Sequence, residues 1–280
     1  MLFGDANPCG KLPETFPMKL EDNPSCLYYG GEGDVTEYRE GIFVGYRYYD
    51  RKKMDVLYPF GHGLSYTTFE YSSLKLSAER IRDTDTLTVT LTVKNTGNRA
   101  GKAVVQLYVG DVESTHIRPV RELKGFAKVA LQPGERKEVS FKLDKRSFAY
   151  WNRQIHDWHV ETGMFTIEAG ASSRDLPLKA EVMVESTVEL PRHYTMDSIF
   201  MDIMADPKAK AVMMPLIQKT MEIFDNSERE GDTEAAKEAV TEDMTMAMMK
   251  YMTLHGVFSF GGGFTAEQAD ELLKELNGEA

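Results

Sequence analysis

The stretch LTVTLTV, from Leu87 to Val93, alternates apolar side chains with threonines. This period of two is typical of a β-strand with one buried and one exposed face. The tetrapeptide Asn95-Thr96-Gly97-Asn98 follows with residues that favour a turn. The stretch therefore predicts a half-buried strand that ends in a turn.

Further short segments of the same kind follow at regular spacing. Turn residues such as Gln132-Pro133-Gly134-Glu135 separate them. Such spacing indicates an antiparallel β-sandwich, which we place at residues 72–188. The other expected strands are residues 104–109, 123–131, 138–143, 148–151, 158–160, 165–169 and 178–184.

An aromatic segment, EGIFVGYRYYDRKKMDVLYPFGHGLSYTTFEYS, precedes the sandwich at residues 40–72. Four glycines interrupt its tyrosines and phenylalanines, and glycine permits a positive φ and a close backbone approach. Such a segment can form an interdomain seam or line a ligand groove. We favour the seam, because aromatic side chains are more often buried in cores than placed in sites.

Residues 1–71 as a whole contain many prolines and glycines and no long periodic run. They predict an irregular N-terminal arm with one or two short strands around residues 41–49.

The composition changes near residue 189. Residues 191–280 hold 8 Lys/Arg and 17 Asp/Glu, a net charge of −9, and are rich in methionine. We expect a C-terminal α-helical extension over residues 189–280, with helices at residues 198–205, 209–224, 233–254 and 265–276.

Two motifs in this extension are specific. Thr265 and Gln268 form a capping box for the last helix, and Gly278 follows as its stop signal. The segment FSFGGGF at residues 258–264 is interpreted as a turn, because it lacks the strand and the Lys and Ser/Thr that a phosphate loop requires. The methionines indicate a small helical core or a docking face; they are Met213, Met214, Met221, Met244, Met246, Met248, Met249 and Met252.

Several long motifs resemble one known family in the expected order. They are LFGDANPCGKLPETFP at residues 2–17, the aromatic segment, VKNTGNRAGKAVVQLYVGD at residues 93–111, RPVRELKGFAKVALQPGE at residues 118–135 and FAYWN at residues 148–152. Together they resemble the C-terminal portion of family 3 glycoside hydrolases of the β-glucosidase type. The resemblance implies the end of an α/β-sandwich domain at residues 1–71, a fibronectin type III-like, immunoglobulin-like β-sandwich at residues 72–188, and then the helical extension.

The resemblance also implies what the chain lacks. A retaining glycosidase needs a nucleophilic carboxylate and an acid/base carboxyl roughly 5–5.5 Å apart. In the resembled family the nucleophilic Asp lies in a Ser-Asp-Trp-type motif on a (β/α)8 barrel, and the acid/base Glu usually lies in the α/β sandwich. We therefore expect a C-terminal fragment that is inactive alone and whose partners are the missing barrel and α/β-sandwich domains, with a β-glucoside as substrate of the whole enzyme.

No residue of this chain is assigned a catalytic, cofactor-binding or metal-binding role. His156-Asp157-Trp158 falls within the part that resembles the type III-like domain, so Asp157 is interpreted as a surface or turn carboxylate. Glu32, in Gly31-Glu32-Gly33, follows the LFGD segment, whereas the family's acid/base Glu precedes it, so Glu32 is interpreted as a loop residue. Glu40 and Asp50 are expected to pair with Arg47 or Arg51 across the seam.

Composition excludes several functions. The net charge of −11 argues against nucleic-acid binding, and no apolar run reaches the roughly 20 residues of a membrane span. The six histidines show no metal-site spacing, and no cofactor motif is present. Cys9 and Cys26 are expected as free thiols, and the visible sequence carries no signal peptide, which favours a cytoplasmic location.

Two rival functions remain open. A carbohydrate-binding module would expose a row of aromatic side chains, with Tyr108, Tyr150, Trp151 and Trp158 as candidates, although Trp151 and Trp158 are expected in the core. An interaction protein would self-associate through the methionine-rich tail.

Overall fold

The computed structural model describes residues 1–226, 247, 249–260 and 265–279. Contacts divide the chain into two compact units, residues 1–189 and 190–280.

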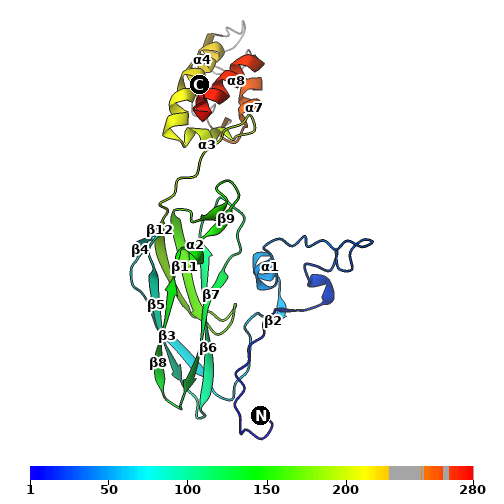
Figure 1. The fold of residues 1–280 in the computed structure, drawn as a ribbon, viewed down its shortest axis with the longest axis vertical. Helices are drawn as coiled ribbons and strands as arrows, with labels where there is room; N and C mark the ends of the chain where they lie inside the picture. Colours follow the sequence, from blue (N-terminus) through cyan, green and yellow to red (C-terminus); the bar gives the residue numbers. More distant parts are fainter. Residues whose placement is uncertain (227–246, 248, 261–264, 280) are drawn as a thin grey trace, which may run out of the picture. The chain divides into compact units, whose positions relative to one another are not determined.

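Two β-sheets form the body of the first unit (Figure 1). The three-stranded sheet has the order β3-β5-β8, and the five-stranded sheet has the order β4-β12-β11-β6-β7. Neighbouring strands are antiparallel except β4 and β12, which are parallel and depart from the expected antiparallel pattern. The strands are β3 (Phe69–Leu76), β5 (Leu87–Asn95) and β8 (Arg136–Leu143) in the first sheet, and β4 (Arg80–Arg82), β12 (Leu178–Glu185), β11 (Gly163–Gly170), β6 (Gly101–Asp111) and β7 (Glu122–Leu131) in the second.

Strand β5 shows how the sequence pattern becomes structure. Its Leu and Val side chains are fully buried, and the threonines between them are partly exposed. Its apolar face joins a core that includes Leu107, Phe165 and Val182 of the opposite sheet. Complete burial of a Val, Leu or Phe side chain stabilises a fold by about 1.5–3 kcal/mol, so the alternating pattern provides much of the driving force for joining the two layers.

The turn after β5 is fixed by a buried amide. Asn95 is fully buried, and its Oδ1 accepts hydrogen bonds from Thr67 Oγ1 at 2.6 Å and from Gly97 N at 3.1 Å. Its Nδ2 donates to Arg99 O at 2.7 Å and to Leu131 O at 3.2 Å. The Asn-Thr-Gly-Asn segment therefore forms a turn and, through Asn95, also hydrogen-bonds to residues that are distant in the sequence.

The strand predicted at residues 148–151 begins later in the structure, at Tyr150. Residues 145–148 are a short helix, α2 (Lys145–Phe148), and the strand that follows is β9 (Tyr150–Asn152). It pairs with β10 (Asp157–His159) in a separate two-stranded hairpin.

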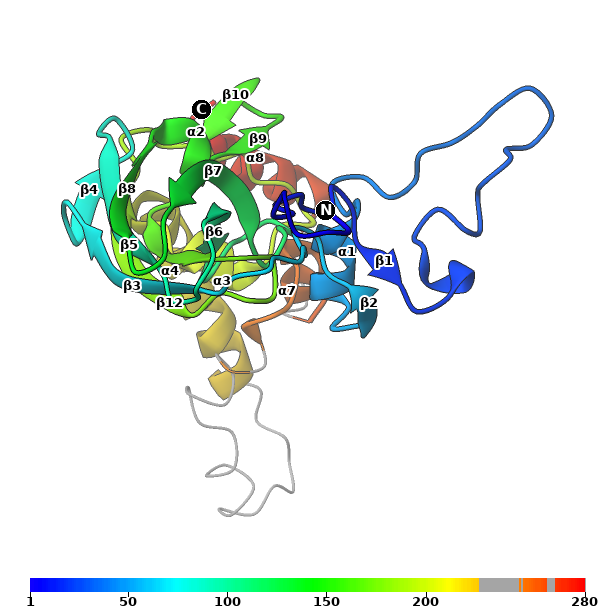
Figure 2. The ribbon, with the colours of Figure 1, turned by 90° about the horizontal axis from the view of Figure 1, so that it is seen from below.

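The N-terminal arm contains β1 (Phe16–Pro17), the 3-10 helix η1 (Leu20–Asp22), α1 (Tyr46–Arg51) and β2 (Val56–Tyr58). The expectation of strands around residues 41–49 was wrong, because α1 begins at Tyr46 and buries Tyr49. In both views the blue loop between β1 and α1 runs away from the two sheets (Figures 1 and 2). It carries strongly exposed apolar and aromatic side chains, including Leu27, Tyr29 and Tyr38.

The second unit contains α3 (Phe200–Met204), α4 (Pro207–Asn226), α7 (Leu254–Phe260) and α8 (Ala266–Asn277). Phe200, Ile203, Met213 and Leu254 are in its core. The predicted capping box is present, with Thr265 accepting from Gln268 N, and Gly278 has the left-handed conformation of a helix stop.

Some expectations for this unit fall outside the described residues. They include most of the helix expected at residues 233–254, the glycines of FSFGGGF, and Met244, Met246 and Met248. Met213 and Met249 are buried in the helical core, and Met214 and Met252 pack against it.

Candidate functional site

The aromatic segment meets the sandwich through Tyr46. The Tyr46 ring stacks on Phe60 with centroids 4.8 Å apart and meets the edge of Tyr108 at 5.9 Å. Its hydroxyl accepts a hydrogen bond from Leu123 N at 2.8 Å. As expected for a seam, these rings lie against the sandwich, whereas Tyr58 and Tyr66 of the same segment remain exposed.

A buried glutamine connects three parts of this seam. Gln106 is only 3% exposed on β6, and its Nε2 donates to Gly61 O at 3.1 Å and to Ala171 O at 2.7 Å. Its Oε1 accepts from Tyr108 Oη at 2.6 Å. Burial, together with the nearby Tyr46 and Asp50, raises the pKa of Tyr108, so its hydroxyl stays protonated and acts as a donor.

Glycine is required at the point of closest approach. Gly61 has φ +79°, and a Cβ atom there would lie 2.1 Å from Gln106 Oε1. Only glycine permits this approach without displacing the amide.

Two ion pairs also cross the seam, with partners different from those expected. Asp50 Oδ1 is 3.0 Å from Arg174 Nε, and Arg174 Nη2 donates to Met54 O at 2.8 Å. Arg47 Nη2 is 3.0 Å from Glu122 Oε1. The expected pairing of Glu40 or Asp50 with Arg47 or Arg51 was wrong, because the folded sheet brings Arg174 and Glu122 to the segment.

A buried arginine holds the loop between β6 and β7. The side chains of Arg118 and Asp111 are 9% and 2% exposed, and Arg118 Nη1 lies 2.8 Å from Asp111 Oδ2. The same guanidinium donates to Phe148 O at 3.0 Å and to Ala149 O at 3.4 Å. Burial raises the pKa of Asp111, and the positive charge of Arg118 partly offsets this effect.

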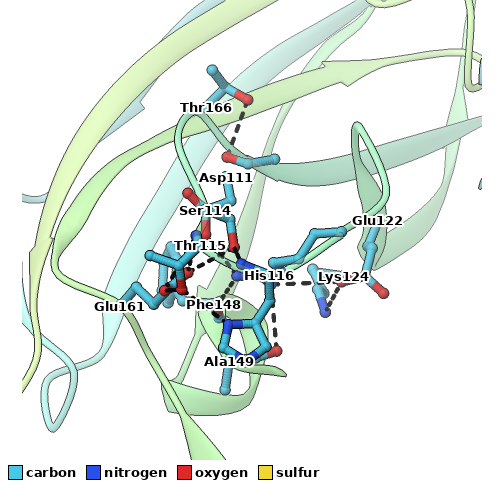
Figure 3. Close-up of polar contacts among 12 residues, drawn as sticks. Asp111, Ser114, Thr115, His116, Glu122, Lys124, Phe148, Ala149, Glu161 and Thr166 are labelled. Carbon is cyan, nitrogen blue, oxygen red and sulfur yellow. Dashed lines mark hydrogen bonds and ion pairs between the residues drawn. The ribbon is translucent and has the colours of Figure 1, made fainter. Parts of the chain in front are cut away.

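A second anchor holds the same loop (Figure 3). Glu161 accepts a hydrogen bond from Ser114 Oγ at 2.6 Å, and it also accepts from the backbone N–H and the hydroxyl of Thr115. Burial would raise the pKa of Glu161, but these hydrogen bonds outweigh it and lower the pKa. The β6–β7 loop is therefore fixed at two separate points.

The carboxylates considered at the sequence level lie apart from these anchors. Asp157 is exposed on β10, and its Oδ1 accepts from Trp158 N at 2.7 Å. Glu32 is exposed in the arm, where it forms an isolated bridge with Val35. Among the described residues, no group of three or more His, Cys, Asp or Glu is arranged to hold a metal ion, and Cys9 and Cys26 are free.

The expectation that both tryptophans lie in the core was wrong for Trp151. Trp151 is 50% exposed, whereas Trp158 is partly buried and packs against the core. Tyr108 is fully buried and Tyr150 is half-buried, so these four aromatic residues form no exposed row.

Sequence reasoning also missed Gln106, Arg118 and Arg174. One signal was available for Gln106, because a single amide interrupts the apolar run VVQLYV of β6. A polar side chain at a core position requires a hydrogen-bond partner, but the sequence does not name that partner.

The geometry describes a β-sandwich joined by buried polar contacts to an irregular N-terminal arm. Comparison with known families gives the same division: residues 103–173 match the fibronectin type III-like domain, and residues 1–66 match the glycosyl hydrolase family 3 C-terminal domain. These features define the class of protein: the part of a glycoside hydrolase that lies outside its barrel domain.

Individual relatives support the same class of protein. Thermostable beta-glucosidase B of Acetivibrio thermocellus is 49% identical over 278 residues, which cover 99% of this chain and 36% of that protein. An exo-alpha-(1->6)-L-arabinopyranosidase of Bifidobacterium longum is 46% identical over 176 residues, 63% of this chain and 23% of that protein. The crystal structure of a family 3 beta-glucosidase of Bifidobacterium adolescentis has a TM-score of 0.67 at 41% identity, covering 76% of this chain and 31% of that chain.

The chain belongs to glycoside hydrolase family 3 and corresponds to the C-terminal portion of a β-glucosidase-like protein. It spans 36% or less of the length of these relatives.

Proposed function

We propose that this chain is a structural portion of a retaining β-glucosidase-like enzyme and is inactive alone. Its sandwich buttresses the catalytic domains by holding the family 3 C-terminal segment in place. The observation that carries this proposal is the seam, where Gln106 and Arg174 bind backbone carbonyls of the arm. Such contacts are specific in position, because a buried donor without its acceptor costs about 1–3 kcal/mol.

The partners we propose are the (β/α)8 barrel and the remainder of the α/β-sandwich domain, of which residues 1–71 form the last part. The match of residues 1–66 to the family 3 C-terminal domain supports this proposal. The exposed Leu27, Tyr29 and Tyr38 also support it, since an exposed group of large apolar side chains is typical of a surface that a partner covers.

The substrate of the assembled enzyme is proposed to be a β-glucoside. The relatives include enzymes named for glucosides and one named for arabinopyranosides. The choice of sugar therefore belongs to the domains that hold the catalytic carboxylates, and not to this chain.

An assay of the purified chain with an aryl β-glucoside tests the inactivity. We expect no turnover from the wild-type chain or from the Glu32→Gln and Asp157→Asn variants. Turnover that persists through repurification and disappears in either variant would refute the proposal, because it would place a catalytic carboxylate in this chain.

Self-association through the helical extension is a second candidate property. Met201 and Tyr251 are exposed on that unit, at 41% and 76%. Light scattering of the whole chain over a range of concentrations tests it, and a constant monomeric mass would exclude it.

A further inference from the structure

The β9–β10 hairpin forms a sheet of its own, separate from the two main sheets of the first unit. An isolated two-stranded hairpin is at best marginally stable in water, so its contacts with the sandwich decide whether it stays in place. Two neighbouring side chains of β10 provide such contacts: Trp158 packs against the sandwich core, and His159 is only 5% exposed. The attachment of the hairpin therefore includes a buried group that can take up a proton.

His159 is buried without a partner for one of its ring nitrogens. Its ring meets Tyr150 edge-on, with centroids 5.8 Å apart, but among the described residues its Nδ1 has no hydrogen-bond partner. A neutral imidazole carries one N–H, whereas a protonated imidazole carries two, so that both nitrogens must donate. Protonation would therefore place a charge and an N–H where the fold offers Nδ1 no acceptor, and burial of such a group is costly.

Charged and titratable groups from four other parts of the fold act on His159. Burial lowers the pKa of His159, and Lys145 of α2 and His116 of the β6–β7 loop act in the same direction. The carboxylates of Glu161, after β10, and Asp83, after β4, act against this effect without overcoming it. The surroundings as a whole thus favour the neutral imidazole while the hairpin is in place.

Both of these carboxylates have other partners. Glu161 accepts hydrogen bonds from Ser114 Oγ at 2.6 Å and from Thr115 (Figure 3). Asp83 Oδ1 accepts from Thr187 N at 3.0 Å, but its Oδ2 has no partner among the described residues. A pair between Asp83 Oδ2 and protonated His159 is therefore the rival outcome, and it would close the hairpin more tightly at low pH.

We propose that the β9–β10 hairpin is an acid-sensitive latch, which leaves the sandwich when His159 is protonated while the two main sheets stay folded. In the open state the charged imidazole is solvated by water, so protons shift the equilibrium towards that state. The carbonyls of Phe148 and Ala149, to which Arg118 donates, come directly before β9, so release of the hairpin also affects the contacts of the β6–β7 loop. This device goes beyond the proposed buttressing function and does not depend on it.

Hydrogen exchange of the whole chain, resolved by mass spectrometry, tests the latch. Rates at pH 7 and pH 5, corrected for the intrinsic pH dependence of exchange, give the protection of the amides of residues 150–159 and of β5 as an internal reference. With a pKa of about 6.5 for the open hairpin, uptake of one proton raises the open population by at most about 25-fold between these pH values. We expect the hairpin amides to lose between about threefold and 25-fold in protection, with no comparable loss in β5.

Two variants separate His159 from other titrating groups. His159→Gln removes the buried imidazole, so the protection of the hairpin should be the same at both pH values. His156→Asn removes an exposed histidine of the same hairpin and suits its φ of +48°, because asparagine tolerates the left-handed region. This variant should keep the wild-type response. Each variant is compared with itself at two pH values, so a loss of stability caused by the substitution does not obscure the result.

Four results would overturn the proposal. The first two are unchanged hairpin protection in the wild type and an equal pH response in His159→Gln. The third is an equal loss of protection in β5, which would show that the whole unit opens. The fourth is greater hairpin protection at pH 5, which would show that protonated His159 pairs with Asp83 and tightens the hairpin.

Discussion

Replacement of Arg118 by methionine tests whether the buried ion pair holds the β6–β7 loop. The side chains of Arg118 and Asp111 are 9% and 2% exposed, so removal of the cation leaves a carboxylate in the interior without its partner. Removing one partner of a buried pair costs about 3–5 kcal/mol. The lost hydrogen bonds to Phe148 O and Ala149 O are included in this cost.

Thermal unfolding followed by tryptophan fluorescence measures this loss, because both tryptophans lie in the sandwich unit. For a unit of 189 residues, each kcal/mol corresponds to about 2–4 °C in Tm. We therefore expect Arg118→Met to lower Tm by on the order of 6–20 °C. The double variant Asp111→Leu/Arg118→Met should recover much of the loss, because replacing a whole buried pair by apolar groups is often neutral.

The pH dependence of the Arg118→Met effect gives a second check. Burial already raises the pKa of Asp111 in the wild type, and the loss of Arg118 raises it further. A carboxyl whose pKa is higher in the folded than in the unfolded state gains protons on folding, so its destabilising effect shrinks as the pH falls. The stability gap between Arg118→Met and the wild type should therefore narrow from pH 7 towards pH 5.

An exposed ion pair provides the matched control. Arg80 and Glu185 are 2.6 Å apart, but their side chains are 68% and 39% exposed. Arg80→Met should cost less than about 1 kcal/mol. If Arg118→Met costs no more than Arg80→Met, or if its effect does not narrow at low pH, the assigned role of the buried pair is wrong.

Two further predictions concern the seam and a buried histidine. Gly61→Ala introduces backbone strain that by itself costs roughly 1–3 kcal/mol. Its Cβ would also lie 2.1 Å from Gln106 Oε1, so the free energy of unfolding should fall by more than this amount. Limited proteolysis within residues 1–66 should become faster. Gly134→Ala has a similar φ of +76° with no atom within 4 Å, so an equal loss in both variants would contradict the seam contact. Burial lowers the pKa of His159 despite the nearby Glu161 and Asp83, so the folded state disfavours the protonated form and wild-type stability should fall as the pH drops below the unfolded pKa of about 6.5. His159→Gln should lose less stability than the wild type between pH 7.5 and 5.5 in urea titrations, and parallel curves would refute this assignment.

The sandwich strands could be predicted because their signal is local. The alternation in β5 and the turn at Asn95 depend on residues within a few positions of each other. The helix α8 was predicted for the same reason, since Thr265, Gln268 and Gly278 provide its start and stop signals. The short helix α1 was not predicted, because its tyrosines favour strands whereas its arginines favour helices, so local propensity does not decide the conformation. The burial of Tyr49 in the folded chain favours the helix.

The ion pairs of the seam, by contrast, could not be predicted from local patterns. The sequence correctly indicated that the aromatic segment would lie against the sandwich, but it gave the wrong partners for Asp50 and Arg47. Arg174 is 124 positions away from Asp50 in the sequence, and no local pattern connects two residues so far apart. The exposure of Trp151 was missed for a related reason, because the period-two pattern does not show that β9 and β10 form a separate hairpin beyond the two sheets.

The β-sandwich, the class of protein and the ends of helix α8 could be predicted before folding is considered, because they depend on short-range patterns or on long motifs in a fixed order. The pairing of buried charges, the requirement for glycine at position 61 and the exposure of an indole ring follow from the folded arrangement, because burial and pairing depend on which distant strands become neighbours. Once the sheets have formed, a buried polar group must be satisfied by whatever lies beside it.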